Sequence, residues 1–175
     1  MRICRVVIGL MVIATGAAGS SAAQKKPLAS PRDSVKATIS GATIEVNYGR
    51  PSMKGRVVVG GLIPYDQVWR TGANEATSLV TSKMLMIGNL MVPAGKYTIY
   101  TLAGKTGWKL IINKQTGQWG LEYKPEMDLG RVDLTLEALP SAVEQFTIKI
   151  VPAGAAGALR LEWDKTAASV SFMVH

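Results

Sequence analysis

Short segments of alternating apolar and polar residues, each ended by turn-forming residues, fill most of this sequence. Residues 35–39 and 43–48 alternate in this way, and Ser40-Gly41-Ala42 stands between them. A period of two is typical of a strand with one buried face, whereas a surface helix has a period near 3.6. We therefore expect an antiparallel hairpin here. Its buried face should carry Ile44, Val46 and Tyr48.

The same pattern continues to the end of the sequence. Gly88-Asn89 suits a tight hairpin turn, and Asp164-Lys165-Thr166 suits another. The one candidate helix, residues 121–129, contains Pro125 and should give at most one turn. These features predict an all-β chain: a single-domain antiparallel β-sandwich, jelly-roll-like, of about ten short strands over residues 35–175. The further strands are expected at residues 76–81, 84–87, 90–92, 96–102, 108–112, 132–136, 143–150, 158–163 and 169–174.

The N-terminal residues have a different character. Arg2 and Arg5 flank the start of an apolar run at residues 6–14, and small residues follow as far as Ala23. This is the pattern of a signal peptide over residues 1–23, with cleavage after Ala23 and a polar leader at residues 24–34. An uncleaved anchor is the alternative, but the apolar run is shorter than the roughly 20 residues that span a bilayer. We expect export to the periplasm or the outside, with no membrane span left after cleavage.

Several kinds of chemistry lack their usual residues. Cys4, the only cysteine, lies in the predicted signal peptide, and His175, the only histidine, is the last residue of the sequence. The sequence therefore lacks the residues for serine–histidine and cysteine–histidine catalysis. It also lacks the usual ligands of zinc, copper and haem. We expect no cofactor, no metal and no catalytic residue. The formal charge of +8 is scattered along the chain without a basic stripe, so we expect no nucleic-acid partner.

The candidate site residues come from loops that mix cations, amides, acids and aromatics. VWRTGANEAT (68–77) carries Trp69, Arg70, Asn74 and Glu75. Trp69 and Arg70 should point to opposite sides of the chain. The Glu75 carboxylate could accept hydrogen bonds from an arginine or from backbone N–H groups. A carboxylate clamped to a guanidinium would be structural, whereas one facing a cavity would contact ligand. Both readings stay open.

Two further loops add to this set. Arg50 and Arg56 lie in YGRPSMKGR (48–56) and could fork around an anion, or Arg50 could pair with an acid of the same fold. Trp119 follows Gln118 in a loop after a strong strand, and Asp128 comes soon after. Aromatic faces and amides suit a sugar, but Trp119 could instead cap the core.

The motifs SPRDSVKATISG, VNYGRPSMKGR, GGLIPYDQVWRTGANEAT, VPAGKYTIYTL, INKQTGQWG and LEWDKTAASVSF, in this order, resemble the DUF2911 family of exported bacterial proteins. The likeness covers residues 30–174. It implies an exported, β-rich single domain and no known activity or catalytic residue. The family's signature falls on Arg50, Trp69, Arg70, Asn74, Glu75 and Trp119.

Three functions are compatible with these residues. The first is a non-catalytic binding module for a small polar or anionic ligand, such as a saccharide. The second is a scaffold of the cell envelope that binds another protein, with its Arg and Glu residues as clamps. The third is a hydrolase that uses two carboxylates, for which Glu75 and Asp128 are the only pair we nominate.

Overall fold

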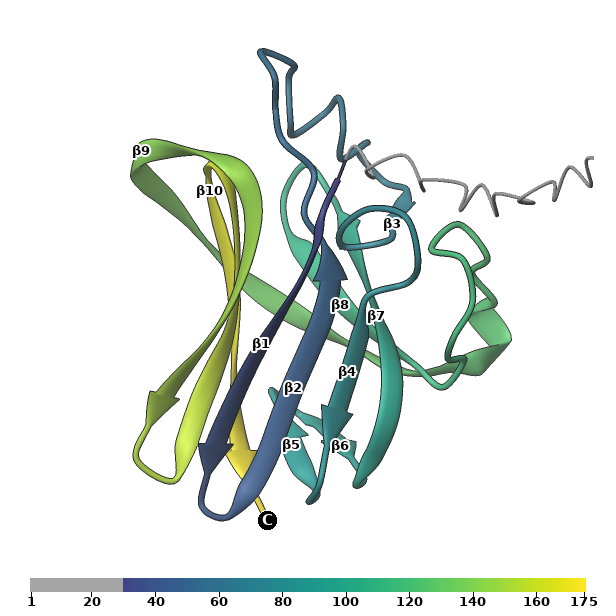
Figure 1. Cartoon of the computed structure of the whole chain (residues 1–175), viewed down its shortest axis with the longest axis vertical. Coiled ribbons are helices and arrows are strands. Elements are labelled where there is room, and N and C mark those ends of the chain that lie inside the picture. The colour runs from purple at the N-terminus through teal and green to yellow at the C-terminus, as the bar shows by residue number, and fades with distance from the viewer. Residues whose placement is uncertain (1–29) are drawn as a thin grey trace, which may run out of the picture.

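The computed structural model describes residues 30–175, and its ten strands form one antiparallel sheet (Figure 1). The all-β prediction is therefore confirmed. Along the sheet the order is β1-β2-β4-β7-β8-β9-β10-β5-β6, and β3 pairs with β7. The strands are β1 (Arg32–Ile39), β2 (Ala42–Gly49), β3 (Val68–Trp69), β4 (Ser78–Thr81), β5 (Leu85–Ile87), β6 (Leu90–Val92), β7 (Gly95–Ala103), β8 (Trp108–Asn113), β9 (Asp128–Ala153) and β10 (Ala156–Val174).

Two of the predicted hairpins are present. β1 and β2 pair from Ile39 opposite Ala42 onward, and the two turn residues Ser40 and Gly41 both have positive φ, at 48° and 73°. Such a two-residue turn matches the twist of the flanking strands. β5 and β6 form a second hairpin around Gly88-Asn89. The candidate helix at 121–129 is reduced to one 3-10 turn, η1 (Pro125–Met127), as predicted.

The C-terminal half differs from the prediction, because four expected strands are two long ones. β9 runs for 26 residues and β10 for 19. The predicted hairpin turn at Asp164 is wrong: Val143 pairs with Asp164 and Ala138 with Thr166, so the chain continues through an irregular step in the ladder. The turn-forming residues near Pro140 lie opposite those near Asp164. They bend the β9–β10 ribbon rather than reverse the chain, as bulges do.

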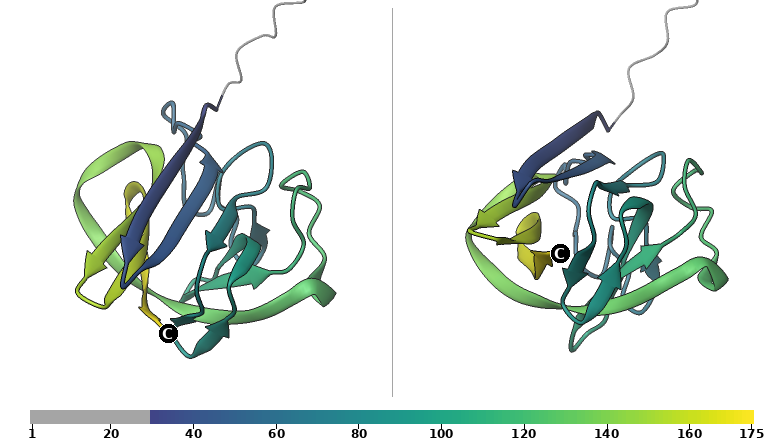
Figure 2. Two further views of the ribbon diagram at one scale, coloured as in Figure 1. Left: turned by 60° about the horizontal axis from the view of Figure 1, so that its bottom comes forward. Right: turned by 90° about the horizontal axis from the view of Figure 1, so that it is seen from below.

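The sheet folds over so that its two halves face each other, which gives the sandwich-like form predicted (Figure 2). β9 connects the halves, because its first residues pair with β8 and its later residues pair with β10. One hydrophobic core fills the space between them, with buried side chains from β2, β4, β7 and β8 on one side and from β5, β9 and β10 on the other. The inward face of β2 carries Ile44, Val46 and Tyr48, as expected.

The chain after β2 joins β9 along a short seam, which we define as the contacts of residues 48–53 with residues 144–148. Ser52 and Gln145 form an isolated antiparallel bridge, and the Phe146 N–H donates to the Pro51 carbonyl at 2.9 Å. Inside the fold, the Tyr48 hydroxyl accepts the Ile148 N–H at 3.0 Å. The seam fixes the loop after β2 against the far half of the sheet.

The predicted signal peptide and most of the predicted leader lie outside the described residues. β1 begins at Arg32, inside the segment that we expected to be a polar leader, because Arg32 and Asp33 continue the pairing with the end of β2. Within residues 30–175, no helix has the length and apolar character needed to cross a membrane.

Candidate functional site

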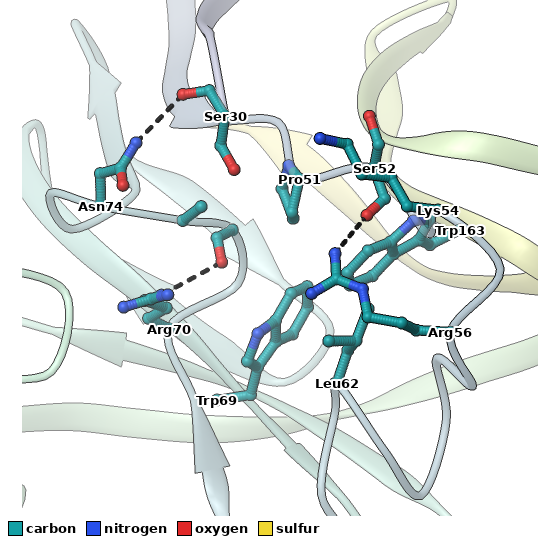
Figure 3. Close-up of a pocket in the computed structure, with 12 residues that line it drawn as sticks. Ser30, Pro51, Ser52, Lys54, Arg56, Leu62, Trp69, Arg70, Asn74 and Trp163 are labelled. Carbon is teal, nitrogen blue, oxygen red and sulfur yellow. Dashed lines mark hydrogen bonds between the residues drawn. The ribbon is translucent and has the colours of Figure 1, made fainter. Parts of the chain in front are cut away.

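A cavity of about 320 Å³, which we call the loop cavity, lies where the loop after β2 meets the loop after β3 (Figure 3). Ligand pockets in proteins start at about this size. Four predicted site residues line the loop cavity: Arg56, Trp69, Arg70 and Asn74. The other lining residues are Ser30, Pro51, Ser52, Lys54, Leu62, Gly72, Ala73 and Trp163.

The apolar part of the cavity wall belongs to a buried aromatic cluster. The Trp69 and Trp163 rings stack with their centroids 5.8 Å apart and their planes 20° from parallel. Phe146 lies edge-on to Trp69 at 5.0 Å. Both tryptophans are buried, so their position is set by the core rather than by a loop. They offer a rigid aromatic surface to whatever enters the cavity.

The backbone of the loop after β3 is held in an unusual conformation. Thr71 and Asn74 have φ of 51° and 63°, a region that side-chain-bearing residues seldom adopt, least of all a β-branched one. Thr71 is fully buried, and its hydroxyl lies 2.8 Å from that of Thr101. The Thr77 hydroxyl donates to the Thr71 carbonyl at 2.7 Å. These threonines fix a strained loop in one conformation, as is common around binding sites.

Arg70 carries a charge that no acid in residues 30–175 neutralises. Its Nε donates to the Gly72 carbonyl at 3.3 Å, and its guanidinium forms no ion pair in this part of the chain. Burial lowers the pKa of Arg70 from its usual value, although the group stays charged at neutral pH. Its stem packs against Gly120, where an added Cβ would lie 2.8 Å from Arg70 Cδ. The guanidinium is thus partly desolvated and positioned by packing.

Two more cations line the loop cavity, and no acidic residue does. Arg56 donates from Nε to the Met53 carbonyl at 2.9 Å and from Nη2 to the Ser52 carbonyl at 2.7 Å. Lys54 is exposed at the rim. In the view of Figure 3, Trp69 lies between Arg70 and Arg56. The cavity therefore has cations on more than one side and an aromatic wall between them.

Arg50 lies outside the loop cavity and has a structural environment. Its guanidinium pairs with Asp33 at 3.0 Å and donates to the Phe146 carbonyl and the Thr147 hydroxyl of β9, at 3.0 and 2.8 Å. Arg56 lines the loop cavity, whereas Arg50 does not. Of the two readings that the sequence left open for Arg50, its contacts match pairing with an acid of the same fold.

Glu75 and Trp119 lie on the other side of the Arg70 loop. Glu75 pairs with Arg32 at 2.9 Å, a partner that the sequence analysis did not identify. The backbones of Glu75 and Trp119 form a bridge, and the Trp119 ring is 44% exposed, so it does not cap the core. Glu75 and Gln118 line a second cavity of about 320 Å³ with Arg32. Gln118 Oε1 is buried there with no partner in residues 30–175.

Asp128 lines neither of these cavities. Its carboxylate accepts from the Tyr123 hydroxyl at 2.7 Å, from Arg131 Nη2 at 2.9 Å and from Asn113 Nδ2 at 2.9 Å. These contacts hold the loop after β8 against the start of β9. Within residues 30–175, no three His, Cys, Asp or Glu side chains gather in a way that could hold a metal.

Tyr123 should make stability depend on alkaline pH. Burial, together with the hydrogen bond to Asp128, raises the pKa of Tyr123 from 10.0 to about 12. The folded protein therefore keeps this proton where the unfolded chain loses it, so stability is lost as the pH rises from 10 to 12. We expect Tyr123→Phe to show a shallower fall in the free energy of unfolding across this range, measured by urea titration. Exposed Tyr65→Phe should follow the unaltered protein, and equal slopes for all three would contradict the assignment.

The sequence analysis missed several residues of the loop cavity. Trp163 was not among the candidate site residues, and it is a core residue that also lines the cavity. Lys54 was not among the candidate site residues. Arg32, which lines the second cavity and not the loop cavity, was placed in the leader. No local signal marks these residues, because the seam and the pairing of β1 bring them to the site.

Comparisons with known proteins place most of the described chain in one family. A sequence model described as "Protein of unknown function (DUF2911)" matches residues 30–172. No curated protein and no solved structure matches the chain.

Proposed function

The chain belongs to the DUF2911 family, whose description assigns no activity, and we propose that it is a non-catalytic binding protein for a small anionic ligand. The ligand occupies the loop cavity. The observation that carries this proposal is that three cations and no acid line the cavity, one of them the partly desolvated Arg70. A buried charge without a counter-ion is costly, and an anionic ligand would supply that counter-ion.

The shape of the cavity narrows the ligand class. A volume of about 320 Å³ suits a molecule of one ring or a short chain. The guanidinium groups of Arg56 and Arg70 suit carboxylate, sulfate or phosphate groups. The Trp69 ring can stack on a planar group or on a sugar ring of the ligand. An acidic monosaccharide or an organic acid satisfies all three features, in keeping with the polar ligand expected from the sequence.

Arg70→Met tests the proposal, because it removes the charge and keeps most of the stem. A hydrogen-bonded charge pair contributes about 1.5–3 kcal/mol, so we expect affinity to fall roughly 10- to 100-fold. Calorimetric titration with sulfate, phosphate, citrate and glucuronate measures this effect. Lys36→Met removes the same charge from an exposed side chain that lies opposite Glu45 in the β1–β2 hairpin and does not line the cavity, so it should leave affinity within about twofold.

The outcomes separate binding from a structural role. A binder should gain thermal stability from at least one of these anions, and Arg70→Met should abolish that gain without lowering the melting temperature of the free protein. If no anion stabilises the unaltered protein and Arg70→Met is destabilising, the residue is a structural clamp. The proposal would then be wrong, and the envelope scaffold would be favoured.

The scaffold remains the second candidate because Arg50 is a clamp of the kind that it requires. The carboxylate hydrolase receives no support from the geometry. Glu75 is paired with Arg32, and Asp128 is held by several donors outside both cavities. Export to the periplasm or beyond stays part of the proposal, and N-terminal sequencing of native material, with Gln24 as the expected first residue, would test it.

A further inference from the structure

Three methionines form a row across the strands β10, β5 and β6, and none of them lines the loop cavity. Met173 of β10 pairs with Met86 of β5, and Met86 pairs in turn with Met91 of β6. Directly opposite residues of antiparallel strands point to the same face, with Cβ atoms about 4.5–5.5 Å apart. The register therefore places three thioethers side by side, with Met86 in the middle. We call this the methionine row.

The methionine row lies on the outer face of the sheet. The strand neighbours of these residues, Leu85, Ile87, Val92 and Phe172, are buried in the core, so the methionines point the other way. Met91 is 56% exposed and Met173 is 52% exposed. Packing of the core does not explain three large flexible side chains on the solvent face of the sheet. Each exposed methionine leaves apolar surface in water.

A shallow cavity of about 240 Å³ lies beside this row. Met86 and Met173 line it together with Gly88, Ser171 and Phe172, and none of these residues is charged. Hard cations such as Ca²⁺ and Mg²⁺ prefer several oxygen ligands that include carboxylates, and none of these residues has a carboxylate. Thioether sulfur is a soft ligand that selects Cu(I). A neutral ligand set on a basic protein also favours a monovalent over a divalent cation.

His175 lies at the end of β10, next to Met84. The His175 N–H donates to the Met84 carbonyl at 3.0 Å, so the ladder between β10 and β5 continues one pair past Val174. Because side chains alternate along a strand, His175 and Met84 belong to the same face as Met173 and Met86. The only histidine of the sequence is thereby held next to the methionine row.

We propose that the methionine row, Met86 with Met91 and Met173, binds a soft monovalent cation, Cu(I) or its analogue Ag(I). The three rotatable bonds of each methionine allow the sulfurs to converge on one ion without a change in the backbone. The expectation of no metal came from the absence of cysteine and of well-placed histidine, and it did not consider thioethers. This site is independent of the anion-binding proposal.

The first experiment follows the methionine methyl groups by NMR during titration with Ag(I) nitrate in chloride-free buffer. All samples carry Cys4→Ser, so that no thiolate competes. The sequence has eight methionines. We expect the methyl signals of Met86, Met91 and Met173, assigned from their leucine variants, to shift together and to saturate near one equivalent. Signals of Met53 and Met127 should stay in place.

The second experiment measures Cu(I) affinity by competition with bicinchoninate under ascorbate and nitrogen. Loss of groups that merely support a metal ligand typically costs 10- to 100-fold in affinity, so Met86→Leu should cost at least about 10-fold. Met127→Leu is the matched control and should leave affinity within about twofold. Leucine keeps the apolar bulk, and circular dichroism verifies that each variant is folded. Equal affinity for Met86→Leu and Met127→Leu, or an Ag(I) response spread over all methionines, would overturn the site.

Discussion

Gly49→Ala is expected to lower the free energy of unfolding by about 3 kcal/mol, the upper part of the range for overpacking. A Cβ at this position would lie 2.1 Å from the carbonyl oxygen of Ala73. The backbone of residue 49 fixes the position of the Cβ, and the oxygen is a backbone atom, so no side-chain rotation can relieve the clash. The loop after β3 must move as a whole, and the strained Thr71 and Asn74 would move with it. Urea unfolding followed by circular dichroism measures this loss.

Gly107→Ala provides the matched control for this change. An added Cβ at Gly107 meets nothing within 4 Å, and the residue is exposed in the turn between β7 and β8. Its cost should stay within about 0.5 kcal/mol, as for most surface changes. Gly49→Ala should also weaken anion binding, because Ala73 and Asn74 line the loop cavity. Equal stability of the two alanine variants would contradict the close approach of Gly49 to Ala73 in the loop after β3.

Trp163→Ala is the second change with a large expected effect, about 3–5 kcal/mol lost from the free energy of unfolding. The side chain is 4% exposed, stacks on Trp69 and donates from Nε1 to the Glu144 carbonyl at 3.2 Å. Truncation leaves a cavity in the aromatic cluster and removes one of the two hydrogen bonds that the Glu144 carbonyl accepts, the other being from the Met53 N–H. It also loosens the wall of the loop cavity. Circular dichroism during urea unfolding avoids the change in fluorescence that the substitution itself causes.

Trp119→Ala serves as the comparison, since the same side chain is removed from an exposed position. Its cost should be below about 1 kcal/mol, because little of the ring leaves the core on truncation. A loss as large as that of Trp163→Ala would mean that Trp119 packs against the core in solution. That result would restore the capping role considered for this residue from the sequence.

Local patterns were enough to predict the class and most of the strands. Alternation located β1 and β2 to within a few residues. Runs of strand-favouring residues between turn signals did the same for β6–β8, although β7 and most of β8 are buried on both faces. The same reasoning failed near Pro140 and Asp164. Turn-forming residues look alike in a chain reversal and in a bulge, and only the partner strand decides between them. The 26-residue strand β9 could therefore not be recognised from its sequence.

The candidate site could be predicted only in part, for a related reason. Trp69, Arg70 and Asn74 lie close together in the sequence, and the structure keeps them together around the loop cavity. Whether a charged side chain faces a cavity or a partner depends on long-range contacts. Arg50 is paired through Asp33 and β9, and Glu75 through Arg32, whereas Arg70 meets no acid in residues 30–175. The methionine row was missed because its members are up to 87 positions apart (173 − 86 = 87) and adjoin only through strand register.

The seam between the first hairpin and β9 also bears on how the chain acquires its fold. The Tyr48 hydroxyl and the Ile148 N–H are separated by 100 positions. During synthesis from the N-terminus, the early strands must wait with their apolar surface uncovered until nearly the whole polypeptide has emerged. Topologies that depend on such distant pairings fold slowly and are prone to aggregate before completion. The yield of folded protein should therefore depend strongly on chaperones that protect the nascent or translocating chain.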